Sequence, residues 1–93
     1  MDADGYPEQF ELNVIAQWAA KYYRMMDFIK ARWHYANDGY WRQNGRLFFL
    51  STGGWSGNEE IISAMQKNWI FWMFCWRVSR YGGHYVFRLP EEK

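Results

Sequence analysis

Arginine stands beside aromatic residues three times along the chain, at Arg32–Tyr35 (RWHY), Tyr40–Arg46 (YWRQNGR) and Trp76–Tyr81 (WRVSRY). An aromatic ring can stack on a nucleobase while a guanidinium group binds a phosphate bidentately, so this pairing is typical of nucleotide recognition. Aromatic residues and Arg are also enriched in the cores of protein interfaces, and guanidinium groups can simply cover exposed rings. The pattern therefore predicts a binding surface and leaves open whether it takes a small molecule or a protein.

A second candidate for chemistry is the glycine-rich stretch GGWSGNEE, which leads from a predicted strand into a predicted helix. Free backbone N–H groups at such a turn can hold an anion, and Trp55 can stack on a base. The alternative is a tight turn with Trp55 tucked against the helix. Glu59 and Glu60 favour that alternative, because they already complement the helix dipole and would repel an anion. From both patterns, the residues expected to bind a ligand are Gly53, Gly54, Trp55, Ser56, Arg42, Arg46, Arg80, Tyr81 and His84.

The remaining reactive side chains suggest neither catalysis nor a metal site. His34 and His84 are the only histidines, and their spacing to other ligand types is not that of a metal site. The one cysteine, Cys75, excludes an intrachain disulfide, and its apolar neighbours predict a buried, unreactive thiol. We therefore expect no enzyme, no cofactor and no bound metal.

Composition limits the class of protein. The chain has 93 residues, which predicts one domain over 1–93 with loose tails at 1–6 and 90–93. Trp, Tyr and Phe occur seven times each, more rings than a core this small can hide, so we expect a homo-oligomer or a large binding surface. A formal net charge of +1 is too balanced for a non-specific binder of duplex nucleic acid. The chain shows no secretory signal and no apolar run near the roughly 20 residues of a membrane span, so we expect a cytoplasmic protein without membrane contact.

The N-terminal third predicts one long helix. Apolar residues recur at steps of three and four from Ile15 to Trp33, and Gly39 is a plausible stop. A helix over about residues 7–37 would be roughly 45 Å long, which exceeds the width of a domain this small. It must either break or overhang and pair with another subunit, and the near-heptad spacing favours the second.

The rest of the chain predicts two strands, a helix and a third strand, giving an α+β domain of order α-β-β-α-β with a three-stranded antiparallel sheet. Asn44–Gly45 predicts a hairpin with Gln43 opposite Arg46, and the segment 84–89 predicts the third strand. Ser56 and Glu59 form a capping-box pattern at the start of the second helix. Its last part, Trp69–Trp76, is apolar all round and is expected to be the most buried helix.

Three stretches together resemble small, uncharacterised proteins encoded in bacteriophage genomes: GWSGNE at 54–59, the apolar helix to Cys75-Trp76, and SRYGGHY at 79–85. The resemblance covers about residues 46–89 and implies a phage setting, hence the host cell cytoplasm. By analogy, phage accessory proteins of this size often act against host defence. The leading hypothesis is an oligomer that sequesters a nucleotide-like anionic ligand without turnover. The alternative is a protein–protein inhibitor of a host defence factor, or an assembly subunit, that uses the same aromatic and arginine surface.

Overall fold

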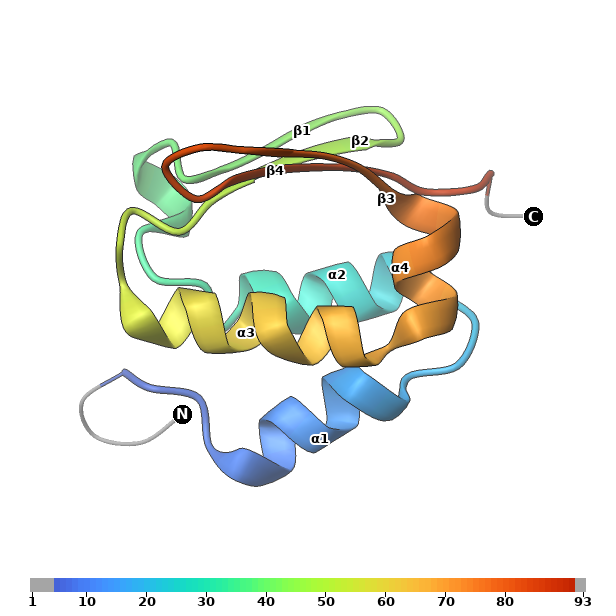
Figure 1. Cartoon of the computed structure of the whole chain (residues 1–93), viewed down its shortest axis with the longest axis horizontal. Helices are drawn as coiled ribbons and strands as arrows, with labels where there is room; N and C mark the ends of the chain where they lie inside the picture. The colour runs from blue at the N-terminus through green and yellow to red at the C-terminus, as the bar shows by residue number, and fades with distance from the viewer. Residues whose placement is uncertain (1–4, 92–93) are drawn as a thin grey trace.

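A computed structural model describes residues 5–91 of the chain. Its elements are α1 (Gln9–Gln17), α2 (Tyr22–Lys30), the 3₁₀ helix η1 (Ala36–Asp38), β1 (Trp41–Asn44), β2 (Leu47–Ser51), α3 (Ser56–Lys67), α4 (Trp69–Cys75), β3 (Trp76–Arg80) and β4 (His84–Arg88). The strands form one antiparallel sheet in the order β1-β2-β4-β3. All four α-helices lie on one side of it, with α2 and α3 beneath the sheet, α4 at one end and α1 beyond α3 (Figure 1). The predicted α+β class is confirmed. The three-stranded sheet is wrong, because Trp76–Arg80 forms a fourth strand.

The predicted long N-terminal helix is also wrong, because the chain breaks between α1 and α2. Ala20 and Lys21 adopt left-handed backbone conformations, with φ of 62° and 50°. The molecule is only 36 Å along its longest axis. The Asn68 side-chain amide stabilises the break by donating hydrogen bonds to the carbonyl oxygens of Ile15 (3.0 Å) and Trp18 (2.8 Å). The Ile15 carbonyl also accepts the Trp18 N–H at 3.3 Å, so the Asn68 amide adds to the capping of the end of α1.

The predicted second helix is likewise divided, and Asn68 lies at the division. It ends α3, and its side-chain oxygen accepts a hydrogen bond from the Phe71 N–H at 3.3 Å, which caps α4. The predicted capping box at the start of α3 does not form. Trp55 occupies the cap position, while the Ser56 hydroxyl hydrogen-bonds to the Tyr6 hydroxyl at 3.2 Å.

The β1–β2 hairpin forms where predicted but in a different register. Its turn residues are Gly45 and Arg46, so Asn44 pairs with Leu47, and Gln43 pairs with Phe48 rather than Arg46. Gly45 has a φ of 61° and Asn44 does not have a positive φ, which puts glycine first in the turn, as in a type II′ turn. The shift is by two residues, so each side chain keeps its predicted face of the sheet.

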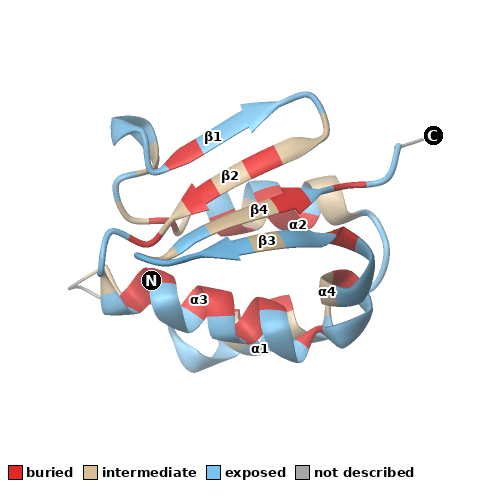
Figure 2. Ribbon diagram, turned by 45° about the horizontal axis from the view of Figure 1, so that its top comes forward, coloured by how far each residue is buried: buried red, intermediate tan, exposed pale blue. Residues whose placement is uncertain are grey.

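The core lies between the sheet and the helices, and Figure 2 shows its buried positions alternating along β2. The strands contribute Trp41, Phe48, Leu50 and Phe87; the helices contribute Met25, Ile29, Ile61, Met65 and Phe71, among others. These residues are at most 6% exposed, so the helices close the central part of the inner face, while Gln43 on β1 and Trp76 and Ser79 on β3 remain exposed at its edges. Burial of this apolar surface is the main stabilising contribution.

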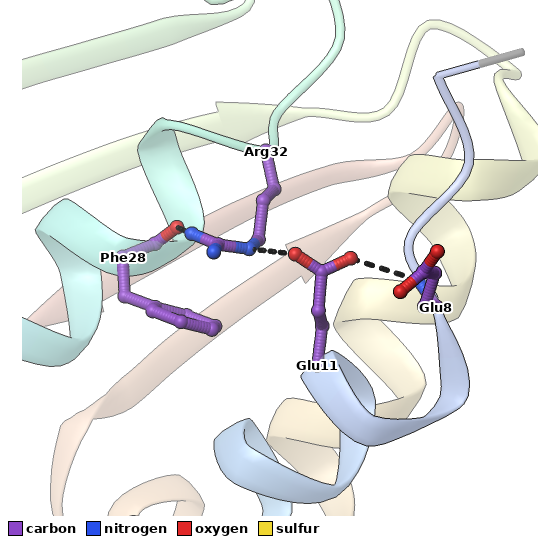
Figure 3. A network of polar contacts seen from close by, with 4 residues as sticks. All are labelled: Glu8, Glu11, Phe28 and Arg32. Atoms are coloured by element: carbon purple, nitrogen blue, oxygen red, sulfur yellow. Dashed lines mark hydrogen bonds and ion pairs between the residues drawn. The ribbon is translucent and has the colours of Figure 1, made fainter. Parts of the chain in front are cut away.

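A buried ion pair connects α1 to the end of α2. The Glu11 carboxylate is 1% exposed, accepts the backbone N–H of Glu8 at 2.9 Å and pairs with the Arg32 guanidinium (Figure 3). Arg32 also donates to the Phe28 carbonyl at 2.9 Å and lies 3.5 Å above the Phe28 ring centre. Burial acts to raise the pKa of Glu11, but hydrogen bonds, including those from Glu8 and Arg32, and the charge of Arg32 outweigh it and lower the pKa to about 2.

Helix α4 is far more exposed than predicted. Trp69, Ile70, Met73 and Phe74 are 65%, 46%, 59% and 62% exposed, and only Phe71 and Cys75 of this helix are fully buried. The helix meets the core along one narrow side, because it stands at the end of the sheet and not beneath it (Figure 1). The prediction of a most buried helix is therefore wrong.

Candidate functional site

The strongest candidate site is the face of the sheet turned away from the helices, here called the outer sheet face. Strand alternation and pairing arrange its side chains in three rows across the strands. The rows are Asn44, Leu47 and Arg88; Arg42, Phe49, Val86 and Val78; and Ser51, His84 and Arg80. The central row crosses all four strands and therefore spans about 14 Å. Within residues 5–91, no helix covers this face (Figures 1 and 2).

The outer sheet face is cationic, and none of the strand residues that form it is a carboxylate. No Asp or Glu occurs between Gly39 and Asn58 or between Ile61 and Pro90, the stretches that contain all four strands. Within the described residues, the side chains of Arg42, Arg80 and Arg88 form no hydrogen bond or ion pair. Their charge is therefore available to an external anion.

A shallow depression of about 280 Å³ lies on this face, between the central row and the row of Ser51, His84 and Arg80. Its lining includes Arg42, Phe49, Ser51, Arg80, His84 and Val86. The Arg42 guanidinium carbon lies 5.8 Å from the Phe49 ring centre, within range of a cation–π contact. Ser51 Oγ and His84 Nδ1 share a hydrogen bond of 2.8 Å, which fixes the imidazole beside the apolar row.

Three of the residues predicted to bind a ligand meet in this depression: Arg42, Arg80 and His84. Tyr81 lies just beyond them at the tip of the β3–β4 hairpin and is fully exposed. Arg46 is not part of the group, because the hairpin turn carries it to a different cavity. Sequence reasoning placed Phe49 on this face but did not single it out. It missed Val78 because β3 was not expected.

The predicted glycine-rich segment is a turn, and its tryptophan, Trp55, already stacks on two other rings of the protein. Trp55 stacks on Tyr6, with ring centres 5.0 Å apart, and on His34, with ring centres 4.3 Å apart. Tyr6, predicted to lie in a loose tail, is thus part of the packed structure, while 1–4 and 92–93 of the predicted tails lie outside the described residues. Gly53 and Gly54 have φ of 62° and 73°, which only glycine adopts easily. Ser56 is exposed beside them.

Internal hydrogen bonds occupy several backbone donors and acceptors of this turn. The N–H of Gly54 donates to Thr52 Oγ1 and that of Trp55 to the Thr52 carbonyl. Asn58 is completely buried; its oxygen accepts the His34 N–H at 2.8 Å, and its amide donates to the carbonyls of His34 and Thr52. The turn thereby holds α3, η1 and the sheet together, which is the structural alternative that the sequence left open.

Comparisons with known proteins add no relative. No protein-family model matches the chain, and neither the curated proteins nor the solved structures contain a match. No described helix is long and apolar enough to cross a bilayer. In residues 5–91, no three His, Cys, Asp or Glu side chains are grouped as metal ligands would be. Function must therefore be inferred from the site itself.

The side chains present support binding better than bond-breaking chemistry. The Ser51–His84 hydrogen bond is the start of a nucleophile–base pair, but in the described structure no carboxylate orients the imidazole. The Cys75 thiol is buried, as predicted, and burial raises its pKa to about 11 although the charge of Arg77 acts in the opposite direction. It is therefore protonated and inaccessible near neutral pH.

A second region with unusual chemistry lies at the opposite end of the strands. A cavity of about 410 Å³ runs beside α4, and its lining includes Tyr22, Ile70, Phe74, Arg46, Arg77 and Arg88. Arg77 donates to the carbonyls of Phe74 (3.1 Å) and Trp76 (3.0 Å) and so closes the end of α4. Arg46 and Arg88 make no side-chain contact of this kind with any described residue. Of the exposed α4 side chains, Ile70 and Phe74 border this cavity.

Proposed function

We propose that this protein binds a nucleotide-like anionic ligand on the outer sheet face and sequesters it without turnover. The single observation that carries the proposal is the central row of that face. Phe49, Val86 and Val78 make an apolar strip with Arg42 at its end, and Arg80 follows one row away. None of the four strands contains an Asp or Glu, so no strand side chain repels an anion.

Each part of the ligand has a matching group on this face. A planar base can stack on Phe49 and its aliphatic neighbours, a contact that contributes about 1–3 kcal/mol for bases on aromatic side chains. The guanidinium groups of Arg42 and Arg80 suit bidentate hydrogen bonds to phosphate. The fixed pair of Ser51 and His84 supplies polar groups for a sugar or a base edge. Turnover is not expected, because in the described structure no carboxylate orients the His84 imidazole as a base for Ser51.

The resemblance of residues 46–89 to small phage-encoded proteins supports a specific setting for this activity. In that setting the ligand is a signalling nucleotide of host defence, and the protein removes it from solution by stoichiometric binding in the host cytoplasm. The resemblance carries no site residue with it, so the choice of ligand rests on the outer sheet face alone.

The test is a thermal-shift panel of linear and cyclic mono-, di- and trinucleotides, with an oligothymidylate as a separate arm. Ligand at a hundred times its Kd should add about 2.7 kcal/mol to the free energy of unfolding, which raises the melting temperature by several degrees for a domain of this size.

We expect the double variant Arg42→Ala with Arg80→Ala to bind the ligand at least about tenfold more weakly. The matched control, Arg24→Ala with Lys30→Ala, removes the same charge from exposed positions of α2. A flat panel, or an equal loss in the control, would contradict the proposal; binding of the oligonucleotide alone would replace the small ligand with single-stranded nucleic acid.

A second candidate function is favoured by a separate observation, the exposed apolar side chains of α4. A protein–protein inhibitor of a defence factor, or an assembly subunit, would use Trp69 and Phe74 as anchors, since large aromatic side chains dominate the energetics of interfaces. This candidate predicts no preference for any nucleotide, so the panel above separates the two.

A further inference from the structure

The cavity of about 410 Å³ beside α4 lies where the end of β4 meets α4 and the turn of the β1–β2 hairpin. Its lining reaches the core at Leu89, which is 1% exposed and whose N–H donates to the Arg46 carbonyl at 2.9 Å. Tyr22, also in the lining, is held by an edge contact with Phe71, with ring centres 5.2 Å apart. The volume lies within the range of about 300–1,000 Å³ that is typical of small-molecule sites, so the cavity fits a small ligand better than a protein segment.

Arginine supplies every charge among the described residues that line this cavity, through Arg46, Arg77 and Arg88. Glu91, the next acidic residue along the chain, is exposed and is not part of the lining. Arg46 is only partly exposed, and within residues 5–91 its guanidinium has no hydrogen bond or ion pair. Partial burial of a charge is costly without a partner, so an external anion would stabilise this end of the molecule.

Arg77 is already fixed in a position that leaves donors for such an anion. Its Nη1 donates to the carbonyl oxygens of Phe74 at 3.1 Å and Trp76 at 3.0 Å. The other two guanidinium nitrogens, Nε and Nη2, form no hydrogen bond in the described structure. A side chain that is held in place loses less freedom on binding, and the planar guanidinium matches a carboxylate in shape.

The same cavity has apolar walls that an inorganic anion would leave uncovered. Ile70 and Phe74 are 46% and 62% exposed, and they line it together with Leu89 and Pro90. Apolar side chains beside a cluster of positive charges fit a ligand that has both an apolar part and a negative charge. A nucleotide matches less well, because the polar edges of its base would face aliphatic side chains.

We infer that this cavity binds a small amphipathic carboxylate. The carboxylate lies at Arg46 and Arg77. The apolar chain or ring packs against Ile70, Phe74 and Leu89. A carboxylate carries one charge and so loses less hydration than a phosphate on entering a site whose other walls are apolar. The inference rests neither on the outer sheet face nor on the protein interface considered for α4.

The test begins with isothermal titration calorimetry of the full chain with octanoate, octanol and acetate, each up to about 5 mM. Octanol keeps the alkyl chain and lacks the charge, whereas acetate keeps the charge and lacks the chain. We expect octanoate to bind at least about tenfold more tightly than either, because only octanoate uses both kinds of wall. A titration with phenylpropionate shows whether a ring or an aliphatic chain fills the apolar part better.

The informative variant is Arg46→Gln, which removes the charge and leaves the backbone bond from Leu89 in place. The matched control is Arg24→Gln, at an exposed position of α2 outside the cavity. We expect Arg46→Gln to bind octanoate at least about tenfold more weakly and the control to bind it like the wild type. Circular dichroism verifies the fold of both variants. In amide NMR spectra of the wild type, octanoate should cause its largest shifts at Ile70, Arg77 and Leu89.

Three results would overturn the inference. They are a failure of octanoate to bind at the highest concentration, an octanol affinity equal to that of octanoate, and an Arg46→Gln variant that binds like the wild type. Binding to phosphatidylglycerol vesicles without binding of free octanoate would also overturn it, and would replace the small ligand with an anionic membrane surface. None of these results bears on the proposed nucleotide site, since Arg42 and Arg80 do not line this cavity.

Discussion

The two faces of the sheet are built from the same strands and the same alternation, yet the helices close the centre of only one of them. On the inner face Phe48 and Phe87 pair across β2 and β4 and are at most 3% exposed beneath the helices. Their sequence neighbours on the outer face, Phe49 and Val86, pair in the same way and remain partly exposed. The inner residues are accounted for by packing. The unpaired arginines around the outer row are not, and this is why the outer face is the better place to look for a ligand.

The largest expected effect comes from breaking the closed face. Phe87→Ala should lower the free energy of unfolding by about 3–5 kcal/mol, because it removes a fully buried ring that contacts Phe71 and Trp72. The adjacent Val86→Ala, on the outer face, should cost less than about 1 kcal/mol. Urea denaturation of both variants measures the contrast. Similar losses would mean that the outer face is covered in solution.

Much of this contrast can be read from alternation, since a two-residue periodicity assigns each strand residue to a face whatever the register. The hairpin shows this: the turn shifted to Gly45–Arg46, yet Trp41 and Phe48 stayed inside and Arg42 and Phe49 outside. The sequence pattern could not show which of the two sheet faces the helices would cover, because both faces carry aromatic residues. That outcome depends on where the helices pack.

The helix breaks could not be predicted for a similar reason. Neither Gly nor Pro stands between α1 and α2, and the left-handed Ala20 and Lys21 carry no local signal. The break depends on Asn68, some 50 residues away, whose amide binds the last carbonyls of α1. Once Asn68 also ends α3, the apolar segment that follows must stand at the end of the sheet. Its exposed side chains are a consequence of that tertiary contact.

A smaller effect is expected for the carboxylate of Glu11, the one charged residue among residues 5–91 that is fully buried. Glu11→Gln should lower the free energy of unfolding by about 2 kcal/mol at pH 7, the usual contribution of a hydrogen-bonded charged group. The folded pKa of Glu11, about 2, lies below its ordinary value of 4.5. The contribution is therefore present in full above pH 4.5 and is lost as the pH falls through 2.

Chemical denaturation of the wild type and of Glu11→Gln between pH 7 and pH 2 measures this pH dependence of the free energy of unfolding. The difference between the two proteins should shrink as the pH falls and approach zero at the acid end. Glu59→Gln, at an exposed carboxylate, is the control and should change the free energy by less than about 0.5 kcal/mol at pH 7. A difference that is constant over the whole range would show that the Glu11→Gln substitution destabilises the protein for steric reasons and not through the lost charge.

The smallest effect is expected for Gly57→Ala in α3, where a gain in helix propensity and a steric clash oppose each other. Gly57 lies in the first turn of α3 without a positive φ, so Gly57→Ala should gain up to about 1 kcal/mol from helix propensity. The added Cβ, however, would lie 2.8 Å from Trp55 Nε1 and 3.3 Å from Pro7 Cδ. Trp55 cannot easily move away, because Tyr6 and His34 stack on its two faces. Since overpacking costs about 1–3 kcal/mol, we expect the free energy of unfolding to fall by about 1 kcal/mol in Gly57→Ala.

Ser63→Ala, at an exposed position of the same helix, is the control and should be neutral or slightly stabilising in the same urea denaturation measurement. A Gly57→Ala variant more stable than the wild type would mean that the Tyr6–Trp55–His34 stack yields, and Trp55 would then regain the freedom that a ligand-binding ring requires.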